Sequence, residues 1–223
     1  MIDIFYTSFT EPLPTTLYSE LLSLLPKDLQ ERNERFLRWQ DKHANLFGKL
    51  LLMEALKYHN INNNLSKLIL YSEHKRPFLT LPSYDFNISH SGAYAICAIG
   101  QNVRIGIDIE KKQDRDFENF DKTMNSKQWE HISSSENPIE TFYKYWTIKE
   151  SVSKADGRGF YIPYEELEVK DKTVQYEGKL WFLSDIDIAE DYSVTIATNK
   201  LSSYKLHKLD FTAATTTLLA NKI

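Results

Sequence analysis

The amino-acid sequence predicts an α+β fold with two comparable lobes, because each half of the chain has helical periodicity followed by short strand-like runs. With 223 residues, of which 42% are hydrophobic and 13% aromatic, the chain is long enough to bury a full core. The sequence has no direct repeat, low-complexity tract or long linker between the halves. Since each half has helices followed by strands, we place the approximate boundary of the two lobes between residues 105 and 106. The lobes are then residues 1–105 and 106–223, and we expect an antiparallel sheet in each.

The amino-terminal lobe begins with a predicted strand at residues 2–6, where apolar residues alternate. Thr15 begins a predicted helix that ends near Pro26. Helical spacing of apolar residues continues over 27–59, with a break expected at 39–42. Strand-like runs bounded by turn-forming residues follow at 67–71, 84–88, 93–99 and 103–109. These runs predict an antiparallel meander.

The carboxy-terminal lobe begins with two predicted helices, at residues 125–134 and 138–155. Gly157 and Gly159 end the second helix. Five strand-like runs follow, at 167–170, 174–176, 180–183, 192–197 and 204–209. They predict a second antiparallel sheet.

Charge and cysteine content exclude several classes of protein. The net charge of −4 argues against general nucleic-acid binding and against a polybasic membrane surface. The start of the chain lacks a signal-peptide pattern, and nowhere do 18 apolar residues follow one another, so we expect a cytoplasmic protein with no membrane contact. Cys97, the single cysteine, lies in an apolar run and is expected to be buried and inert.

The basic residues are concentrated in one stretch of the chain, which allows either a local anion site or a solvated basic face. Ten of them fall between residues 27 and 76: Lys27, Arg32, Arg35, Arg38, Lys42, Lys49, Lys57, Lys67, Lys75 and Arg76.

Asp108 and Glu110 stand on either side of Ile109 at the end of a predicted strand. Successive side chains of a strand point to opposite faces, so the two carboxylates project from one face about 6 to 7 Å apart. Such a pair can share Mg²⁺, which prefers oxygen ligands and is commonly bound beside substrate phosphates. The alternative is a solvated acidic pair at a strand end.

Trp146, Glu150 and Lys154 follow one another four residues apart in the predicted helix at 138–155. This spacing places them on one helix face, separate from the apolar stripe of the same helix. A glutamate and a lysine four residues apart often form only a surface ion pair. The bulky Trp146 one turn earlier makes a solvated face less natural.

Ser89 and His90 precede Gly92 at the end of a predicted strand. Hydroxyl, imidazole and backbone N–H groups together can form an anion pocket, although serine and histidine are also ordinary turn residues. Upstream, Lys75 and Arg76 add two cations, and the guanidinium fork suits phosphate best.

Together these residues resemble the signature of the 4′-phosphopantetheinyl transferase superfamily. The segment Gly106–Glu110 is followed about 40 residues later by Trp146–Lys154, in the order of that signature. The run Phe86–Gly92 is similar to the Phe-Asn-Ile-Ser-His-Ser-Gly motif of the surfactin-synthetase-activating type. Weaker similarity flanks these motifs, so the resemblance covers nearly the whole chain.

The resemblance implies transfer of the phosphopantetheine arm of coenzyme A to a serine of an apo carrier protein of the acyl, peptidyl or aryl type, with release of adenosine 3′,5′-bisphosphate. It also implies that the protein is a monomer. Within its single chain two similar lobes would pack together as a pseudo-dimer, with coenzyme A in the cleft between them. On this resemblance Asp108, Glu110 and Glu150 hold Mg²⁺, and Asp108, Glu150 and Lys154 are catalytic. The implied contacts with coenzyme A are Arg32, Lys75, Arg76, Ser89, His90 and Lys154.

Some roles stay open within the resemblance. Glu150 would hold the metal, deprotonate the carrier serine, or do both. The carrier is expected to dock over the segment after Glu110, with Phe117, Phe120 and Met124 as apolar anchors.

Two positions depart from the family pattern. Gln128 stands where relatives often have a glutamate, and an amide cannot act as a base. Ala44 and Asn45 stand where a basic or hydroxyl residue often helps to bind the 3′-phosphate. Two other functions fit the same residues: a Mg²⁺-dependent pyrophosphohydrolase of coenzyme A or nucleotides, and a non-catalytic module that binds coenzyme A or a carrier.

Overall fold

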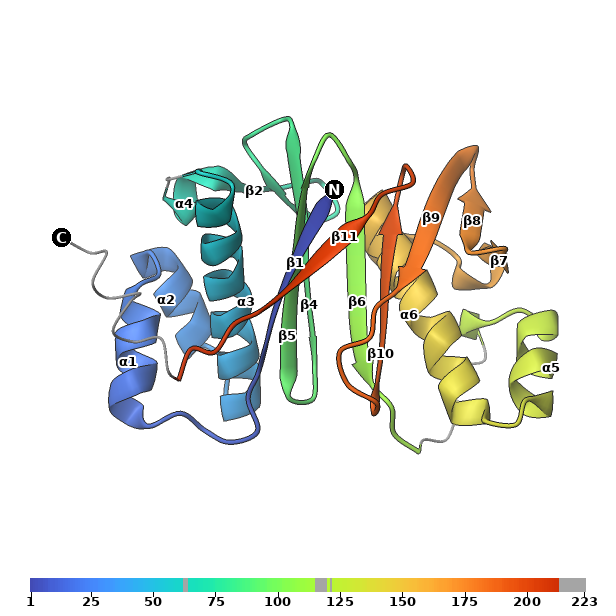
Figure 1. Ribbon diagram of the computed structural model, residues 1–223, viewed down its shortest axis with the longest axis horizontal. Helices are drawn as coiled ribbons and strands as arrows, with labels where there is room; N and C mark the ends of the chain where they lie inside the picture. Colours follow the sequence, from blue (N-terminus) through green and yellow to red (C-terminus); the bar gives the residue numbers. More distant parts are fainter. Residues whose placement is uncertain (62–63, 115–119, 121, 213–223) are drawn as a thin grey trace.

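The computed structural model describes residues 1–61, 64–114, 120 and 122–212 (Figure 1). Its first elements are β1 (Ile2–Ser8), α1 (Thr15–Ser23), α2 (Lys27–Glu34), α3 (Trp39–Tyr58), α4 (Leu65–Leu68), β2 (Ile69–Tyr71), β3 (Pro77–Leu79), β4 (Tyr84–Ser91) and β5 (Tyr94–Gln101). The later elements are β6 (Ile105–Lys111), α5 (Ser126–Ser134), α6 (Pro138–Asp156), the 3₁₀ turns η2 (Gly159–Tyr161) and η3 (Tyr164–Glu166), β7 (Glu168–Lys170), β8 (Thr173–Tyr176), β9 (Lys179–Asp185), β10 (Tyr192–Thr198) and β11 (Tyr204–Lys208).

Two sheets lie between two groups of helices, which confirms the predicted α+β class (Figure 1). The first sheet has the strand order β11-β1-β5-β4 and lies next to α3, whereas the second has the order β6-β10-β9-β8-β7 and lies next to α6. Within the described part of the chain, no helix has the length and apolar content that a membrane span needs.

The pairing of the strands differs from the predicted meander. β4 and β5 form an antiparallel pair, but β6 pairs with β10 in the second sheet, and β2 and β3 form a separate two-stranded sheet. β11 lies parallel beside β1 in the first sheet, so the expected second lobe of residues 106–223 is wrong for this strand. Short apolar runs indicate strands but carry no information about which partner each strand takes.

The break in the first helical stretch is also displaced. It falls at residues 35–38, whereas residues 39–42 form the first turn of α3. Asp41 in that turn carries a negative charge, which suits a helix amino terminus. The boundary therefore lies a few residues earlier than the apolar spacing predicts.

Three of the four hydrophobic cores of the described residues fill the layers, and the fourth joins α5 to α6. The first lies between α3 and the first sheet, the second between the two sheets, and the third between α6 and the second sheet. Ile96 and Cys97 of β5 enter the second and the first core respectively, so this strand is buried on both faces.

Cys97 is fully buried, as its sequence context predicts, and burial raises the pKa of its thiol to about 12. Because the thiolate is the reactive form, we expect no reaction of native protein with a disulfide reagent such as dithiobis(nitrobenzoate) at pH 8. One thiol per chain should react after unfolding in guanidinium chloride. Rapid labelling of the folded chain would contradict the position of β5 between two cores.

A ladder of side chains joins the two sheets where β4 and β6 lie side by side. Every second residue of β4 accepts a hydrogen bond from a backbone N–H of β6, always 20 positions later in the sequence. The four pairs are Asp85 with Ile105 (2.8 Å), Asn87 with Ile107 (2.9 Å), Ser89 with Ile109 (3.4 Å) and Ser91 with Lys111 (3.1 Å). This ladder sets the register between the sheets and brings Ser89 beside Asp108.

Candidate active site

β6 and α6 lie in direct contact at the centre of the molecule. The isoleucines of β6 point into the core between the sheets, so Gly106, Asp108 and Glu110 face α6. A Cβ atom on Gly106 would lie 1.9 Å from the carbonyl oxygen of Ser151 and 2.4 Å from the nitrogen of Ala155. Glycine at this position therefore allows α6 to lie against β6, which brings the polar face of the helix to the carboxylates.

Asp108 is the centre of the resulting network. Its side chain is buried, and Oδ1 accepts hydrogen bonds from Lys154 Nζ (2.6 Å) and Ser89 Oγ (3.0 Å). Oδ2 is buried and has no hydrogen-bond partner among the described residues. Burial raises the pKa of Asp108 to about 7; Glu150 and Glu110 add to the rise, and Lys154 opposes it. Oδ2 of Asp108 is therefore available to accept a hydrogen bond or to bind a cation.

Glu110 is held by two side chains. Ser91 Oγ donates to its Oε2 (2.7 Å), and the indole Nε1 of Trp146 donates to its Oε1 (3.3 Å). This contact explains why a tryptophan stands on the polar face of α6, one turn before Glu150.

Glu150 completes the group of carboxylates. Burial raises the pKa of Glu150 above its ordinary value, and Glu110 adds to the rise. Lys154 and a hydrogen bond from the Tyr164 hydroxyl act in the opposite direction. The sequence pattern did not single out Tyr164, because it reaches Glu150 from the separate turn η3.

The three carboxylates supply oxygen ligands only, the charges of Glu110 and Glu150 raise the pKa of Asp108, and Asp108 Oδ2 lacks a partner in the described chain. This donor set fits a hard divalent cation, whose charge would relieve the mutual repulsion. The described residues contain no three His, Cys, Asp or Glu side chains already arranged to hold a metal ion. Asp108 Oδ1 instead faces Lys154. The assignment of Asp108, Glu110 and Glu150 as metal ligands therefore stays a prediction.

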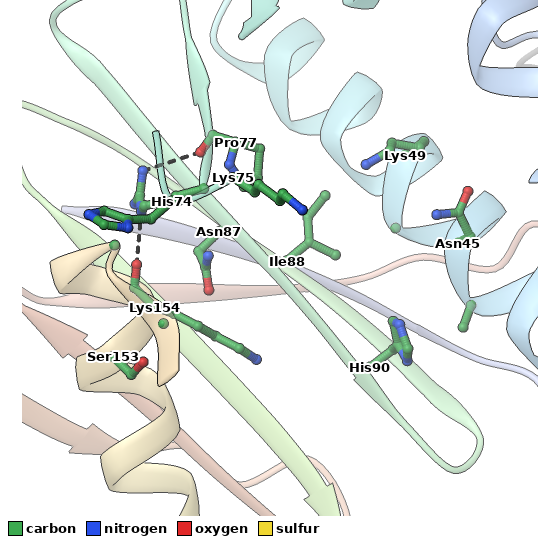
Figure 2. A pocket seen from close by; sticks show the side chains of 15 residues that line it. Asn45, Lys49, His74, Lys75, Pro77, Asn87, Ile88, His90, Ser153 and Lys154 are labelled. Atoms are coloured by element: carbon green, nitrogen blue, oxygen red, sulfur yellow. Dashed lines mark hydrogen bonds between the residues drawn. The ribbon is translucent and has the colours of Figure 1, made fainter. Parts of the chain in front are cut away.

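A cavity of about 350 Å³ opens beside this network, between α3, the loop before β3, β4 and the end of α6 (Figure 2). Six cationic or imidazole residues line it: Lys49, His74, Lys75, Arg76, His90 and Lys154. The structure thus brings Lys75, His90 and Lys154 together, as predicted. Lys154 belongs to both parts of the site, since it lines the cavity and its ammonium group contacts Asp108.

Lys49 is one of the ten basic residues between positions 27 and 76, but no motif assigned it to the site. It lies one turn after Asn45 on α3, and both side chains line the cavity. Figure 2 shows the side chains of Lys49 and Lys75 extending toward the space between α3 and the loop. Neither ammonium group has a hydrogen bond or ion pair with any described residue. Burial lowers the pKa of Lys49, and the charge of Arg32 lowers it further. The spacing of four residues from Asn45 was the signal that could have identified Lys49.

His90 lines the cavity on the side of β4. Desolvation and the nearby charge of Lys154 lower the pKa of His90 below its ordinary value. Its imidazole is therefore mainly neutral at pH 7 when the cavity holds no anion.

Three other predicted contacts lie in different surroundings. Arg32 donates to the Tyr71 hydroxyl (3.0 Å), and its guanidinium lies over the Tyr71 ring, outside the cavity lining. The hydroxyl of Ser89 is buried and bonded to Asp108 and Lys154. Arg76 borders the cavity, but its guanidinium is buried and bonded to other parts of the protein. Direct contact of these three residues with coenzyme A stays a prediction.

Gln128 has a structural position. Its side chain caps α5 together with Asn125, accepts a hydrogen bond from Lys149 Nζ (2.6 Å) and donates to the Leu167 carbonyl (3.1 Å). These bonds lie at the amino end of α5 and explain why an amide is accommodated where a base was expected.

The predicted carrier-docking anchors are Phe117, Phe120 and Met124. Met124 is 3% exposed, so its side chain is not available as the predicted apolar anchor for a carrier. Phe120 packs edge-on against Phe142 and Trp146. Phe117 lies outside the described residues.

Two family models match successive parts of this chain. Residues 104–197 match the family model of the 4′-phosphopantetheinyl transferase superfamily, and residues 11–102 match the model described as 4′-phosphopantetheinyl transferase, N-terminal. The chain is 31% identical to the 4′-phosphopantetheinyl transferase gsp of Aneurinibacillus migulanus over 166 aligned residues. The aligned region covers 73% of this chain and 69% of the relative.

Two further relatives give similar values. The 4′-phosphopantetheinyl transferase Sfp of Bacillus subtilis is 28% identical over 162 residues, or 71% of this chain and 72% of the relative. The L-aminoadipate-semialdehyde dehydrogenase-phosphopantetheinyl transferase of Xenopus laevis is 30% identical over 179 residues, or 70% of this chain and 59% of the relative.

Proposed function

Because this chain belongs to the 4′-phosphopantetheinyl transferase superfamily, we propose that it transfers the 4′-phosphopantetheine arm of coenzyme A to a serine of an apo carrier protein. The serine oxygen forms a bond to the phosphorus that carries the pantetheine arm. The bond from that phosphorus to the nucleotide breaks, and adenosine 3′,5′-bisphosphate leaves. The observation that carries the proposal is the junction at Lys154 of a cationic cavity with the buried Asp108 and the half-buried Glu110 and Glu150.

The cavity suits the anionic part of coenzyme A. Lys49 and Lys75 have no anionic partner in the described chain, and Lys154 extends from α6 toward the same space (Figure 2). Ammonium groups that are partly desolvated gain more from a bound phosphate than groups in bulk water. These lysines would hold the phosphates with the pyrophosphate next to Asp108.

The carboxylates suit the reacting end. Asp108, Glu110 and Glu150 would hold Mg²⁺, which neutralises charge on the pyrophosphate when bound. Glu150 would also accept the proton of the carrier serine, because its raised pKa makes it a stronger base than an exposed glutamate. Lys154 would donate a hydrogen bond to a phosphate oxygen while Asp108 holds its ammonium group in place. A single chain carries both parts of the site, which favours action as a monomer.

We expect Lys49→Met to raise the KM for coenzyme A about tenfold and to leave kcat within about twofold, because the lysine contributes uniform binding of substrate and transition state. Initial rates at varied coenzyme A and saturating carrier measure both constants. Lys57→Met is the matched control, since Lys57 lies two turns further along α3 and pairs with Glu54 at the surface. An unchanged KM in Lys49→Met would remove this residue from the anion site.

Product analysis separates the proposed function from its alternatives. Chromatography of a reaction with coenzyme A, Mg²⁺ and an apo carrier should show adenosine 3′,5′-bisphosphate only when the carrier is present. A pyrophosphohydrolase would release free phosphopantetheine without a carrier. A non-catalytic binding module would leave coenzyme A unchanged while still binding it.

A further inference from the structure

Two arginines bind the carboxyl-terminal end of α6 from outside the helix. Arg76 Nε donates to the carbonyl oxygen of Lys154 (2.8 Å), which is one of the dashed lines in Figure 2. Arg104 Nε donates to the carbonyl oxygen of Ala155 (2.7 Å), and its Nη2 donates to that of Asp156 (3.4 Å). The last carbonyls of a helix lack partners within the helix and carry partial negative charge, so cations are favourable there. We call Arg76 and Arg104 the arginine cap of α6.

Arg76 uses its complete set of donors within the protein. Besides the bond to Lys154, Nη1 donates to the Pro77 carbonyl and to Asp85 Oδ1, and Nη2 donates to Asp85 Oδ2 and to the Ile105 carbonyl. A guanidinium has five N–H groups, and these five bonds occupy all of them. The side chain is 5% exposed. Arg76 therefore has no N–H left for a phosphate, although it borders the cavity.

The five bonds of Arg76 connect separate elements. Asp85 lies on β4 and also accepts the backbone N–H of Ile105 at the first rung of the ladder between the sheets. Arg104 lies just before β6 and pairs with the same carboxylate at 3.9 Å. The arginine cap thus ties the end of α6 to the seam between β4 and β6.

Gly157 makes room for the arginine cap. It ends α6 in a left-handed conformation with φ of 96°, and a Cβ atom there would lie 2.8 Å from Arg76 Cδ and 2.9 Å from Arg104 Nη2. Glycine is suited to this position both by the backbone angle and by the close approach of the two arginines.

We propose that Arg76 and Arg104 are positioning residues: they fix the end of α6 against the first sheet and thereby set where the Lys154 side chain meets Asp108 and the cavity. The proposal rests on the proposed function, in which Lys154 contacts the reacting phosphates. It assigns the arginines no contact with coenzyme A. Arg104 is not among the residues that line the cavity, so an effect of its replacement on turnover would be indirect, through the end of α6 or the Asp85 carboxylate.

Arg76→Lys distinguishes a positioning residue from a phosphate ligand. A lysine keeps the charge and could still bind a phosphate, but it cannot reproduce a planar fork with five bonds. We therefore expect kcat to fall about tenfold or more, as small displacements of catalytic groups do, with a KM for coenzyme A within about twofold of wild type. A phosphate ligand would show the reverse: nearly normal kcat, and a raised KM in Arg76→Met that Arg76→Lys restores.

Arg104→Met is the second variant, and it guards against misfolding of Arg76→Lys. Its side chain is 37% exposed, so the fold should tolerate the change better. We expect a lower kcat at unchanged KM here too. Lys179→Met is the matched control, because Lys179 contacts the side chain of Asp156 at 2.7 Å without bonding the helix carbonyls.

All rates are measured well below the melting temperature, and circular dichroism checks that each variant is folded. A merely structural role would lower the melting temperature and leave kcat per folded molecule unchanged. Normal kcat in folded Arg76→Lys and Arg104→Met, with an active wild type, would overturn the inference alone. Absence of transfer by the wild-type protein on any carrier would overturn the proposed function instead.

Discussion

Asp108→Asn is expected to lower kcat for phosphopantetheine transfer by about 10³-fold, because it removes the charge at the centre of the proposed cation site. Asp108 Oδ1 already holds Lys154 and Ser89, and Oδ2 is the buried oxygen without a partner among the described residues. An asparagine keeps one acceptor oxygen for Lys154 but is a poor ligand for a hard cation. Transfer rates at saturating coenzyme A and Mg²⁺ measure the loss.

The same variant should keep its thermal stability. Burial raises the pKa of Asp108 to about 7, which means that the charged form is unfavourable in the folded protein. The neutral asparagine avoids this cost, so we expect a melting temperature equal to or above that of the wild type. Asp191→Asn is the matched control, because the Asp191 side chain is 60% exposed. It should change neither kcat nor the melting temperature. An Asp108→Asn enzyme with nearly normal kcat would contradict the role of this carboxylate.

Lys149→Met is expected to have the largest effect on stability, about 3 kcal/mol or more of unfolding free energy, because three oxygens lose a buried donor and each buried unsatisfied group costs about 1–3 kcal/mol. Lys149 is fully buried, and burial lowers its pKa to about 7. Its Nζ donates to Gln128 Oε1 (2.6 Å) and to the carbonyls of Thr123 (2.7 Å) and Tyr164 (2.7 Å). Methionine fills similar space but leaves those three oxygens without this donor.

Thermal unfolding measures the effect. For a chain of this size the melting temperature should fall by about 10 °C. Lys144→Met on the same helix is the matched control; its side chain is 59% exposed and pairs with Asp185, so the melting temperature should change by only about 1 or 2 °C. Equal stability of the wild type and Lys149→Met would show that the three bonds are not made in the folded protein.

Much of the local structure follows from periodicity. The helices near 15–23, 126–134 and 138–156 and the strand at 2–8 lie close to their predicted positions, since each buries one stripe or one face. The return of β11 to the first sheet was not predictable in this way. It depends on contacts between the two ends of the chain, such as His207 with the buried Asp3 (2.8 Å).

The candidate active site was also predictable only where its residues share one element or one recognised signature. Spacing within one element placed Glu150 and Lys154 on one helix face, and a recognised family signature linked them to Asp108. Contacts between distant segments decided the rest. The donors of Arg76 are taken by partners up to 78 residues away, and Lys49 enters the cavity from α3, one turn after Asn45. A basic residue next to a proline looks the same in sequence whether it binds a ligand or holds a helix end.

The most direct test of the central claim is the intact mass of an apo carrier protein after incubation with this enzyme and coenzyme A. We expect the carrier mass to rise by one phosphopantetheine group in the presence of Mg²⁺, and to stay unchanged with excess EDTA. The same gain in EDTA would contradict the cation site at Asp108, Glu110 and Glu150 alone. An unchanged mass of acyl, peptidyl and aryl carriers in Mg²⁺ would contradict the proposed transferase function itself.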